Sequence, residues 1–275
     1  MRTQLDRTIG SIAVHDYPTE SAAAATVVML PSLAQSRWSW VDVANRIDPA
    51  IRCLAIDMPG QGDSPYPPHF MSIFDFADSI RDVLVTEGIE HAVLVGNSLG
   101  AVVASQLAVA EKDLVASVVL VGAPAWADEV ARRAWLRGRS ELLVGPDGLP
   151  RPTTKEAVAA VFGAYDPERH RMMWEEAQKA GRALAWSLWA LYGYDYASQL
   201  EFVDQPLLAV YGSNDWLEKQ SIPTLKRAVS DLHIETVDGG GHLLPLDRPA
   251  ELAALMSGWA SSFHTARSST HSTKE

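Results

Sequence analysis

The residues with the clearest chemical potential are the five from Gly96 to Gly100, which read Gly-Asn-Ser-Leu-Gly. They follow the apolar run 92–95 and precede the Ala/Val-rich stretch 101–110, a pattern that predicts a strand, a tight turn and a helix. A serine in such a turn is exposed at the end of its strand as a nucleophile, and the flanking glycines leave room for neighbouring backbone. The helix start adds partial positive charge where an oxyanion would form. Alone, the motif also fits an ordinary strand-to-helix turn.

A nucleophilic serine needs a base, and the base needs an acid that orients it. Asp215 follows an apolar, strand-like run, and His242 follows another within the sequence Asp-Gly-Gly-Gly-His. The order Ser98, Asp215, His242 is the nucleophile–acid–base order of one large class of hydrolases. Asp238 is a rival for the acid, but it lies only four residues before His242 in a glycine loop, so we prefer Asp215.

The pattern of elements that must position these residues is an alternation of strands and helices. A capping box at Ser72 opens one helix, Gly88 ends it, and Pro249 opens the last helix. Strand-like runs rich in Val, Leu and Ile alternate with such helices, which predicts an α/β fold with a doubly wound, mostly parallel sheet. The predicted strands span residues 11–14, 26–30, 51–56, 91–95, 115–121, 206–211 and 233–237.

The alternation is interrupted by residues 124–204, which are helical in pattern and rich in aromatic residues. We interpret this segment as a helical cap inserted into one core domain that comprises residues 1–123 and 205–264. The small, polar tail 265–275 is predicted to be disordered.

A cap above the serine must form the roof of the substrate pocket, so its aromatic residues predict an apolar portion in the substrate. The candidate pocket residues are Trp126, Trp186, Trp189 and Tyr192. Four arginines also lie on one segment of the cap, and we expect solvated helix surface for most of them, although one could meet a substrate carboxylate. They are Arg132, Arg133, Arg137 and Arg139.

Composition excludes several other classes of protein. The formal net charge of −11 argues against a nucleic-acid partner. No apolar run is long enough for a membrane span, and residues 1–7 lack the apolar core of a signal peptide, so we expect a cytoplasmic protein.

The single cysteine, Cys53, lies in a predicted buried strand, where we expect a small apolar core residue and not a nucleophile. The histidines lack metal-ligand spacing and no glycine loop fits a dinucleotide, so we expect chemistry without a cofactor.

Four stretches together make the chain resemble the α/β-hydrolase superfamily from about Thr26 to Phe263. They are residues 57–64 (Asp-Met-Pro-Gly-Gln-Gly-Asp-Ser), 96–100, 212–215 (Gly-Ser-Asn-Asp) and 241–249 (Gly-His-Leu-Leu-Pro-Leu-Asp-Arg-Pro). The resemblance implies the α/β-hydrolase fold with an inserted cap. It also implies that Ser98 attacks a carbonyl carbon, that His242 takes and later delivers a proton, and that Asp215 holds the imidazole.

The chain departs from the family pattern at the oxyanion hole. The family usually has His-Gly after the strand equivalent to 26–30, whereas this chain has Pro31-Ser32-Leu33. Backbone N–H donors do not depend on the side chain, so we predict a hole made by the N–H groups of Leu33 and Leu99. Pro31 has no N–H to give. The Ser-Leu pair resembles the loop of enol-lactone hydrolases.

These residues favour a serine hydrolase that cleaves a small-molecule carboxylic ester or lactone through an acyl-enzyme on Ser98. One alternative is hydrolysis of a carbon–carbon bond in a diketone, because Gly-Asn-Ser resembles the elbow of meta-cleavage product hydrolases. That group commonly has an aromatic residue where this chain has Leu243. A non-hydrolytic lyase or a ligand receptor on the same fold is a further alternative.

Overall fold

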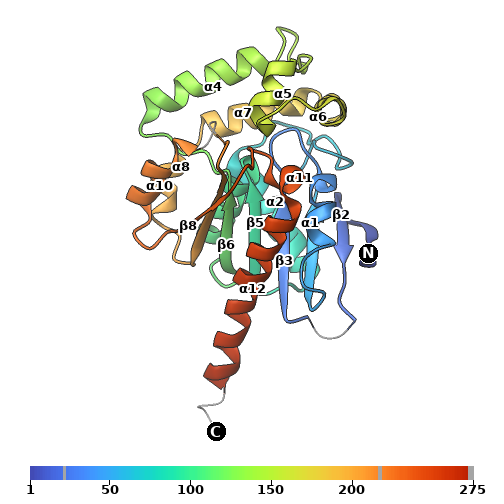
Figure 1. Ribbon diagram of the computed structural model, residues 1–275, viewed down its shortest axis with the longest axis vertical. Helices are drawn as coiled ribbons and strands as arrows, with labels where there is room; N and C mark the ends of the chain where they lie inside the picture. The colour runs from blue at the N-terminus through green and yellow to red at the C-terminus, as the bar shows by residue number, and fades with distance from the viewer. Residues whose placement is uncertain (21–22, 216–218, 272–275) are drawn as a thin grey trace.

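The protein is an α/β structure in which helices cover both faces of one twisted sheet (Figure 1). The computed structural model describes residues 1–20, 23–215 and 219–271. Within them, the strands pair in the order β1-β2-β4-β3-β5-β6-β7-β8. β1–β2 and β2–β4 pair antiparallel, and the other neighbours pair parallel. The strands are β1 Leu5–Ile9, β2 Ile12–Tyr17, β3 Ala25–Leu30, β4 Ile51–Ile56, β5 Ala92–Asn97, β6 Val115–Val121, β7 Leu207–Gly212 and β8 His233–Val237.

The predicted doubly wound, mostly parallel sheet is confirmed, and each predicted strand overlaps an observed one. Only β1 was not predicted. Four of its five residues are exposed, so it lacks the apolar signal of the central strands. Arg7 fixes this edge strand by ion pairs to Asp16 at 2.7 Å and Glu87 at 2.6 Å.

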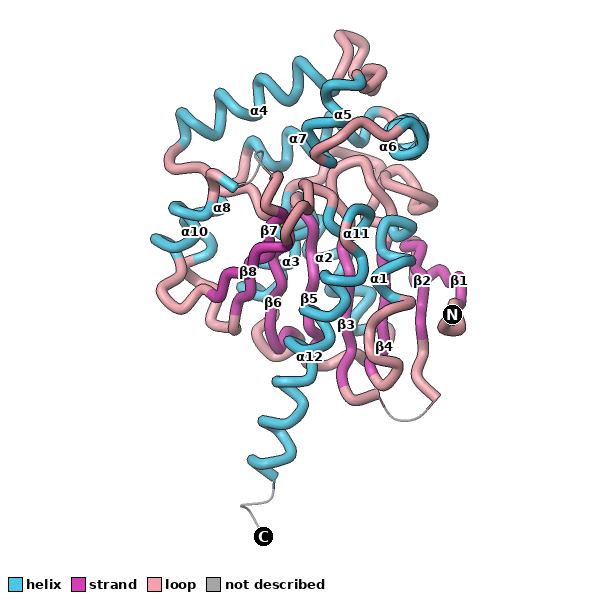
Figure 2. The backbone as a smooth tube through the Cα atoms, viewed as in Figure 1, coloured by secondary structure: helices cyan, strands magenta, loops and turns pink. Residues whose placement is uncertain are grey.

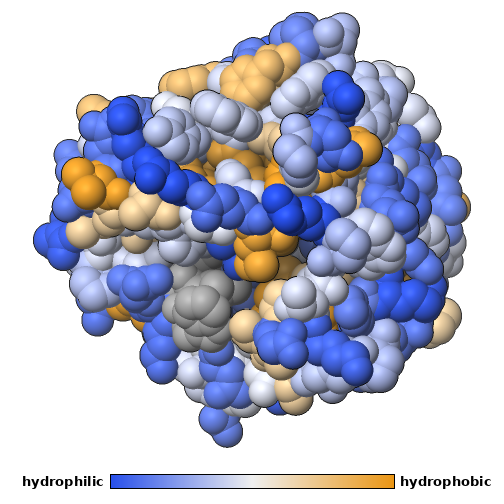
Figure 3. Space-filling model, turned by 90° about the horizontal axis from the view of Figure 1, so that it is seen from above, coloured by the Kyte–Doolittle hydropathy of each residue, from blue (hydrophilic) through white to orange (hydrophobic). Residues whose placement is uncertain are grey.

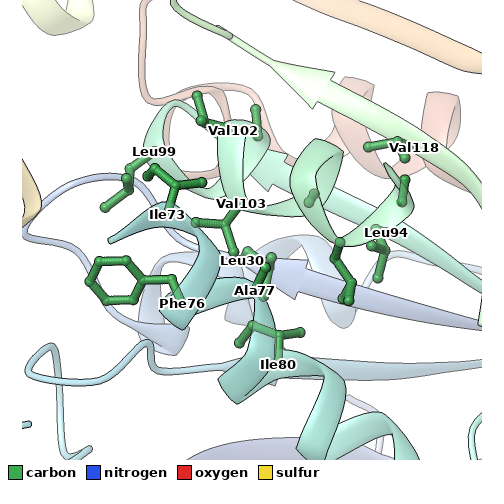
Figure 4. Close-up of a cluster of buried hydrophobic side chains, with 14 of the residues drawn as sticks. Leu30, Ile73, Phe76, Ala77, Ile80, Leu94, Leu99, Val102, Val103 and Val118 are labelled. Carbon is green, nitrogen blue, oxygen red and sulfur yellow. The ribbon is translucent and has the colours of Figure 1, made fainter. Parts of the chain in front are cut away.

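Alternate side chains of the central strands enter two hydrophobic layers, one on each face of the sheet. Val28 and Leu30 pack with helices α2 (Ile73–Thr86) and α3 (Leu99–Ala110). Figure 4 shows the α2 residues Ile73 and Ile80 and the α3 residue Val103 in this layer. Val27 and Met29 face the opposite layer, which α1 (Val41–Ala44) and α12 (Pro249–His271) help to close. The other core helices with described bounds are the 3₁₀ helix η1 (Arg37–Trp40), α10 (Ile222–Ala228) and α11 (Leu244–Asp247).

Two local predictions for the core are confirmed. Ser72 caps α2 by accepting a hydrogen bond from Asp75 N, while Asp75 Oδ2 accepts one from Ser72 N at 2.8 Å. Cys53 is fully buried, and burial raises the pKa of its thiol to about 11. The cysteine is therefore a core residue.

Residues 124–204, here called the helical insert, lie between β6 and β7 in the chain. They form a layer above the carboxyl edge of the sheet (Figures 1 and 2). The far end of the insert is tied to α3, because Tyr194 Oη donates to Gln106 Oε1 at 2.7 Å and Tyr196 Oη lies 3.1 Å from Ser105 Oγ. The insert helices are α4 Glu129–Leu143, α5 Lys155–Phe162, α6 Pro167–Ala180, α7 Arg182–Tyr192 and α8 Tyr196–Leu200.

The last helix, α12, extends into the tail that the sequence predicts to be disordered. It runs from Pro249 to His271. The sequence contains neither proline nor glycine after Gly258, so nothing in it stops the helix. Residues 272–275 lie outside the described residues. No helix in the described ranges is both long and apolar enough to cross a bilayer.

Candidate active site

Ser98 stands in a strained turn between β5 and α3. Its φ of 53° and ψ of −109° lie in a region that residues with side chains rarely adopt. Its N–H donates to Val121 O at 2.8 Å, which fixes the turn to the neighbouring strand. A Cβ at Gly96 would run into the backbone of Gly100, and a Cβ at Gly100 would run into Leu30 O. The two glycines therefore allow the close approach that an elbow requires.

Asp215 and His242 form a buried pair on loops after two neighbouring strands. His242 Nδ1 lies 3.1 Å from Asp215 Oδ2, and the two residues are 4% and 1% exposed, respectively. Asp215 follows β7 and His242 follows β8. Gly122, after β6, borders both, since a Cβ there would lie 3.1 Å from Asp215 Oδ2 and from His242 Nδ1. The contact leaves the imidazole Nε2 as the nitrogen that can serve a substrate or a nucleophile.

Asp238, the rival acid, has different neighbours. Its Oδ1 lies 3.5 Å from Ser213 Oγ, and the contact to the imidazole is made by Asp215. The geometry therefore supports Asp215 as the orienting acid.

Asn97 holds the histidine loop, a contribution that sequence reasoning missed. Its Nδ2 donates to Val121 O at 3.1 Å and to His242 O at 3.2 Å. His242 N in turn donates to Val161 O at 2.7 Å, at the end of α5. The backbone of His242 is thus fixed by the strand that leads to Ser98 and by the helical insert. The signal available in the sequence was an amide side chain directly before the predicted nucleophile.

Ser98 and His242 line one cavity of about 70 Å³. Most of its wall is apolar. The wall residues from the helical insert and from the loops of the sheet include Leu33, Leu143, Val161, Met173, Leu184 and Leu243.

The two predicted oxyanion donors lie at this cavity and at the elbow. Leu33 lines the cavity, and Leu99 is the first residue of α3, where helix geometry leaves the N–H without an intrahelical partner. No backbone hydrogen bond within the described ranges uses either N–H. The side chain of Leu99 is buried near Ile73 (Figure 4), which fixes the helix start. The loop that carries Leu33 and the turn that carries Leu99 approach each other closely. A Cβ at Gly100 would lie against Leu30 O and 2.7 Å from Pro31 O.

The four aromatic residues predicted to form the pocket do not border this cavity. Trp189 is 62% exposed and packs on Tyr192, with ring centroids 5.6 Å apart, beside a separate hollow. Trp126 packs on Trp135, and Trp186 is half-buried. The aromatic residues of α7 miss the cavity because the helix turns the face with Leu184 and Leu191 toward it. The aromatic wall comes instead from Trp135 of α4, which composition could not single out.

The family model described as "Alpha/beta hydrolase family" matches residues 27–255. The chain belongs to this family. Both the predicted superfamily and the hydrolase class are thereby confirmed.

No group of three or more His, Cys, Asp or Glu residues in the described ranges could hold a metal ion.

Individual relatives have low identity but cover nearly the whole chain. "Putative carbamate hydrolase RutD" of Escherichia coli O9:H4 is 27% identical over 269 residues, 90% of this chain and 96% of its own. The (E)-2-((N-methylformamido)methylene)succinate hydrolase of Acinetobacter baylyi is 19% identical and covers 87% of this chain and 92% of its own. A thermophilic esterase from Thermogutta terrifontis has the same fold, with a TM-score of 0.74, 17% identity and coverage of 95% and 99%.

Proposed function

We propose that this hydrolase cleaves carboxylic esters or lactones through an acyl-enzyme on Ser98. The single observation that carries the proposal is the buried Asp215–His242 pair on the cavity that Ser98 also lines. A serine in an elbow, an oriented imidazole and backbone donors are the parts that acyl transfer requires.

In the proposed reaction, Ser98 Oγ attacks the carbonyl carbon while His242 Nε2 takes its proton. The N–H groups of Leu33 and Leu99 donate to the resulting oxyanion. The intermediate then collapses, the carbon–oxygen bond to the alcohol breaks, and His242 returns the proton to the departing alcohol. Water next attacks the acyl carbon as His242 takes its proton. The bond between the acyl carbon and Ser98 Oγ then breaks, the carboxylic acid leaves, and His242 returns the proton to Ser98 Oγ. Asp215 stabilises the imidazolium in both halves.

The proposed substrate has an apolar portion, because the cavity wall is mostly Leu, Val and Met with one tryptophan. The helical insert supplies many of these residues, and we assign it the role of a cap over Ser98. The size of the cavity, about 70 Å³, favours short acyl groups.

Carbamates are a second candidate substrate class. The observation that favours them is the similarity to relatives named as carbamate hydrolases, which cover nearly the whole chain. The same attack on the carbamate carbonyl would expel the alcohol and leave a carbamoyl group on Ser98, which water then hydrolyses.

Turnover of short p-nitrophenyl esters and carbamates tests the proposal. We expect Ser98→Ala to lower kcat/KM by about 10³-fold or more. The matched control is Ser79→Ala on α2, a half-buried serine whose hydroxyl donates to Asp75 O. Persistent turnover in Ser98→Ala would exclude Ser98 as nucleophile. Absence of turnover by the wild type on esters, lactones, carbamates and diketones would favour a receptor or lyase.

A further inference from the structure

Two arginines line the cavity that contains Ser98 and His242. They are Arg139 of α4 and Arg151, which follows the loop after α4. The chain as a whole is strongly acidic, with a net charge of −11. Two positively charged guanidinium groups at one apolar cavity therefore differ in sign from the overall charge. The proposed reaction on a neutral ester has no use for either cation.

Arg151 is held by the backbone of its own loop. Its N–H donates to Leu143 O and its Nε donates to Val144 O, both at 2.8 Å. Val144 and Pro150 form a β-bridge at the base of the loop. The Nε bond fixes the guanidinium and leaves the Nη1 and Nη2 edge for another acceptor. Among the described residues no carboxylate pairs with Arg151.

The loop beneath Arg151 is itself cross-linked by hydrogen bonds. Gly145 N donates to Leu149 O at 2.7 Å, and Gly148 N donates to Gly145 O at 3.0 Å. Asp147 Oδ1 accepts from Leu149 N at 3.0 Å. A tight hairpin of this kind presents its terminal arginine in a fixed place, so little ordering is needed when a ligand binds.

Arg139 is positioned by an aromatic ring. Its guanidinium carbon lies 5.2 Å from the ring centroid of Trp135, within the range of a cation–π interaction. Trp135 lines the same cavity, so the ring and the cation form one part of its wall. Figure 3 looks down on this side of the molecule and shows apolar surface in hollows between bands of hydrophilic side chains.

We propose that the enzyme takes esters whose acyl portion carries a free carboxylate, and that Arg151, with Arg139, binds this carboxylate. This inference rests on the proposed esterase function and names its substrate class. The planar edge of a guanidinium matches a carboxylate with two parallel hydrogen bonds. The acyl portion is the part concerned, because it stays in the cavity on Ser98 while the alcohol leaves.

The test compares charged and neutral esters of the same shape. The charged probes are the monomethyl esters of succinic, glutaric and adipic acids, and each neutral partner has an isopropyl group in place of the carboxylate. Hydrolysis is followed by pH-stat titration, and the readout is the ratio of kcat/KM for each pair. We expect the best wild-type ratio to exceed about 10, and Arg151→Gln to lower it about 10- to 100-fold.

Matched variants separate the arginine geometry from charge alone. Arg151→Lys keeps the charge without the paired hydrogen bonds, so it should recover only part of the ratio. Arg137→Gln removes one positive charge from α4 at a residue that lines a separate hollow, and it should change the ratio less than about twofold. An equal loss in Arg137→Gln and Arg151→Gln, or a wild-type ratio near one, would overturn the inference while leaving the esterase proposal intact.

Binding to the Ser98→Ala protein makes the two proposals separable if no ester is turned over. Isothermal titration calorimetry with the same ester pairs should show tighter binding of a charged ester, which is lost when Arg151→Gln is added. Such selective binding without turnover in the wild type would refute the esterase proposal alone. Equal binding of the charged and neutral esters would refute the carboxylate site.

Discussion

At the scale of single residues, the candidate chemistry depends on side chains that neighbouring backbone holds in place. Ser98 is forced to a positive φ, and the His242 loop is fixed through Asn97 and Val161. The contact between Asp215 and the imidazole is what separates this carboxylate from Asp238.

Replacement of Asp215 by asparagine tests that distinction. The amide keeps the shape but removes the charge that stabilises an imidazolium, so we expect kcat to fall about 10³- to 10⁴-fold on any ester that the wild type hydrolyses. Asp238→Asn, in the neighbouring glycine loop, should change kcat less than about threefold. A larger loss in Asp238→Asn than in Asp215→Asn would assign the acid to Asp238 instead.

The candidate residues could be selected from sequence because a strand end, a glycine turn and chain order are all local signals. The wall of the cavity could not be selected in this way. Trp135 and Arg151 reach it only through the way that α4 and the following loop pack over Ser98. Trp189, on the more apolar helix α7, is 62% exposed.

At the scale of elements, glycines differ in what surrounds them. Gly100, the second residue of α3, lies against the carbonyl groups of Leu30 and Pro31, with no room for a side chain. Gly258 lies within α12 and has open space around the position of a Cβ. The Gly-Asn-Ser-Leu-Gly motif already marks Gly100 in the sequence, whereas Gly258 lies in no such motif.

These two glycines give opposite predictions for stability. Gly258→Ala should stabilise the fold by about 0.5–1 kcal/mol, because alanine loses less backbone entropy on helix formation. In a chain of this size that corresponds to a rise in Tm of roughly 1–4 °C. Gly100→Ala should destabilise by about 2 kcal/mol or more, since the elbow must open. Thermal unfolding followed by circular dichroism measures both. A rise in Tm for Gly100→Ala would contradict the close approach.

The buried strands β2 to β7 were predictable because each contains an apolar run. The edge strand β8 was also predicted, although only Val237 of its five residues is buried. The edge strand β1 was not, because it exposes residues such as Asp6 and is fixed by the ion pairs of Arg7. β1 depends on its pairing with β2 and on these ion pairs, which form only when the sheet edge is assembled.

At the scale of the whole molecule, stability should depend on pH through a buried histidine. His15 is fully buried on β2, and its ring meets Trp38 edge-on at 4.3 Å between centroids. Burial, followed by the charge of Arg37, lowers its pKa from 6.5 to about 4. The unfolded chain then binds more protons than the folded chain between these values.

The contribution of His15 to the free energy of unfolding should therefore be constant above pH 6.5. It should fall by ~2–3 kcal/mol as the pH drops to 4. His15→Phe should flatten this part of the profile, measured by urea unfolding at several pH values. The exposed His69 provides the control, because His69→Gln should leave the slope unchanged. An unchanged slope in His15→Phe would show that other groups cause any acid sensitivity.

The whole arrangement joins a sheet edge that carries Ser98, Asp215 and His242 to a helical insert that supplies much of the cavity wall. In this arrangement Ser98 is the proposed nucleophile. Mass spectrometry of the protein after reaction with a fluorophosphonate, with peptide mapping of the adduct, tests this role directly. We expect one adduct on the peptide that contains Ser98, reduced strongly in His242→Ala and absent in Ser98→Ala. An adduct that persists in Ser98→Ala, or that maps to another serine, would contradict this role.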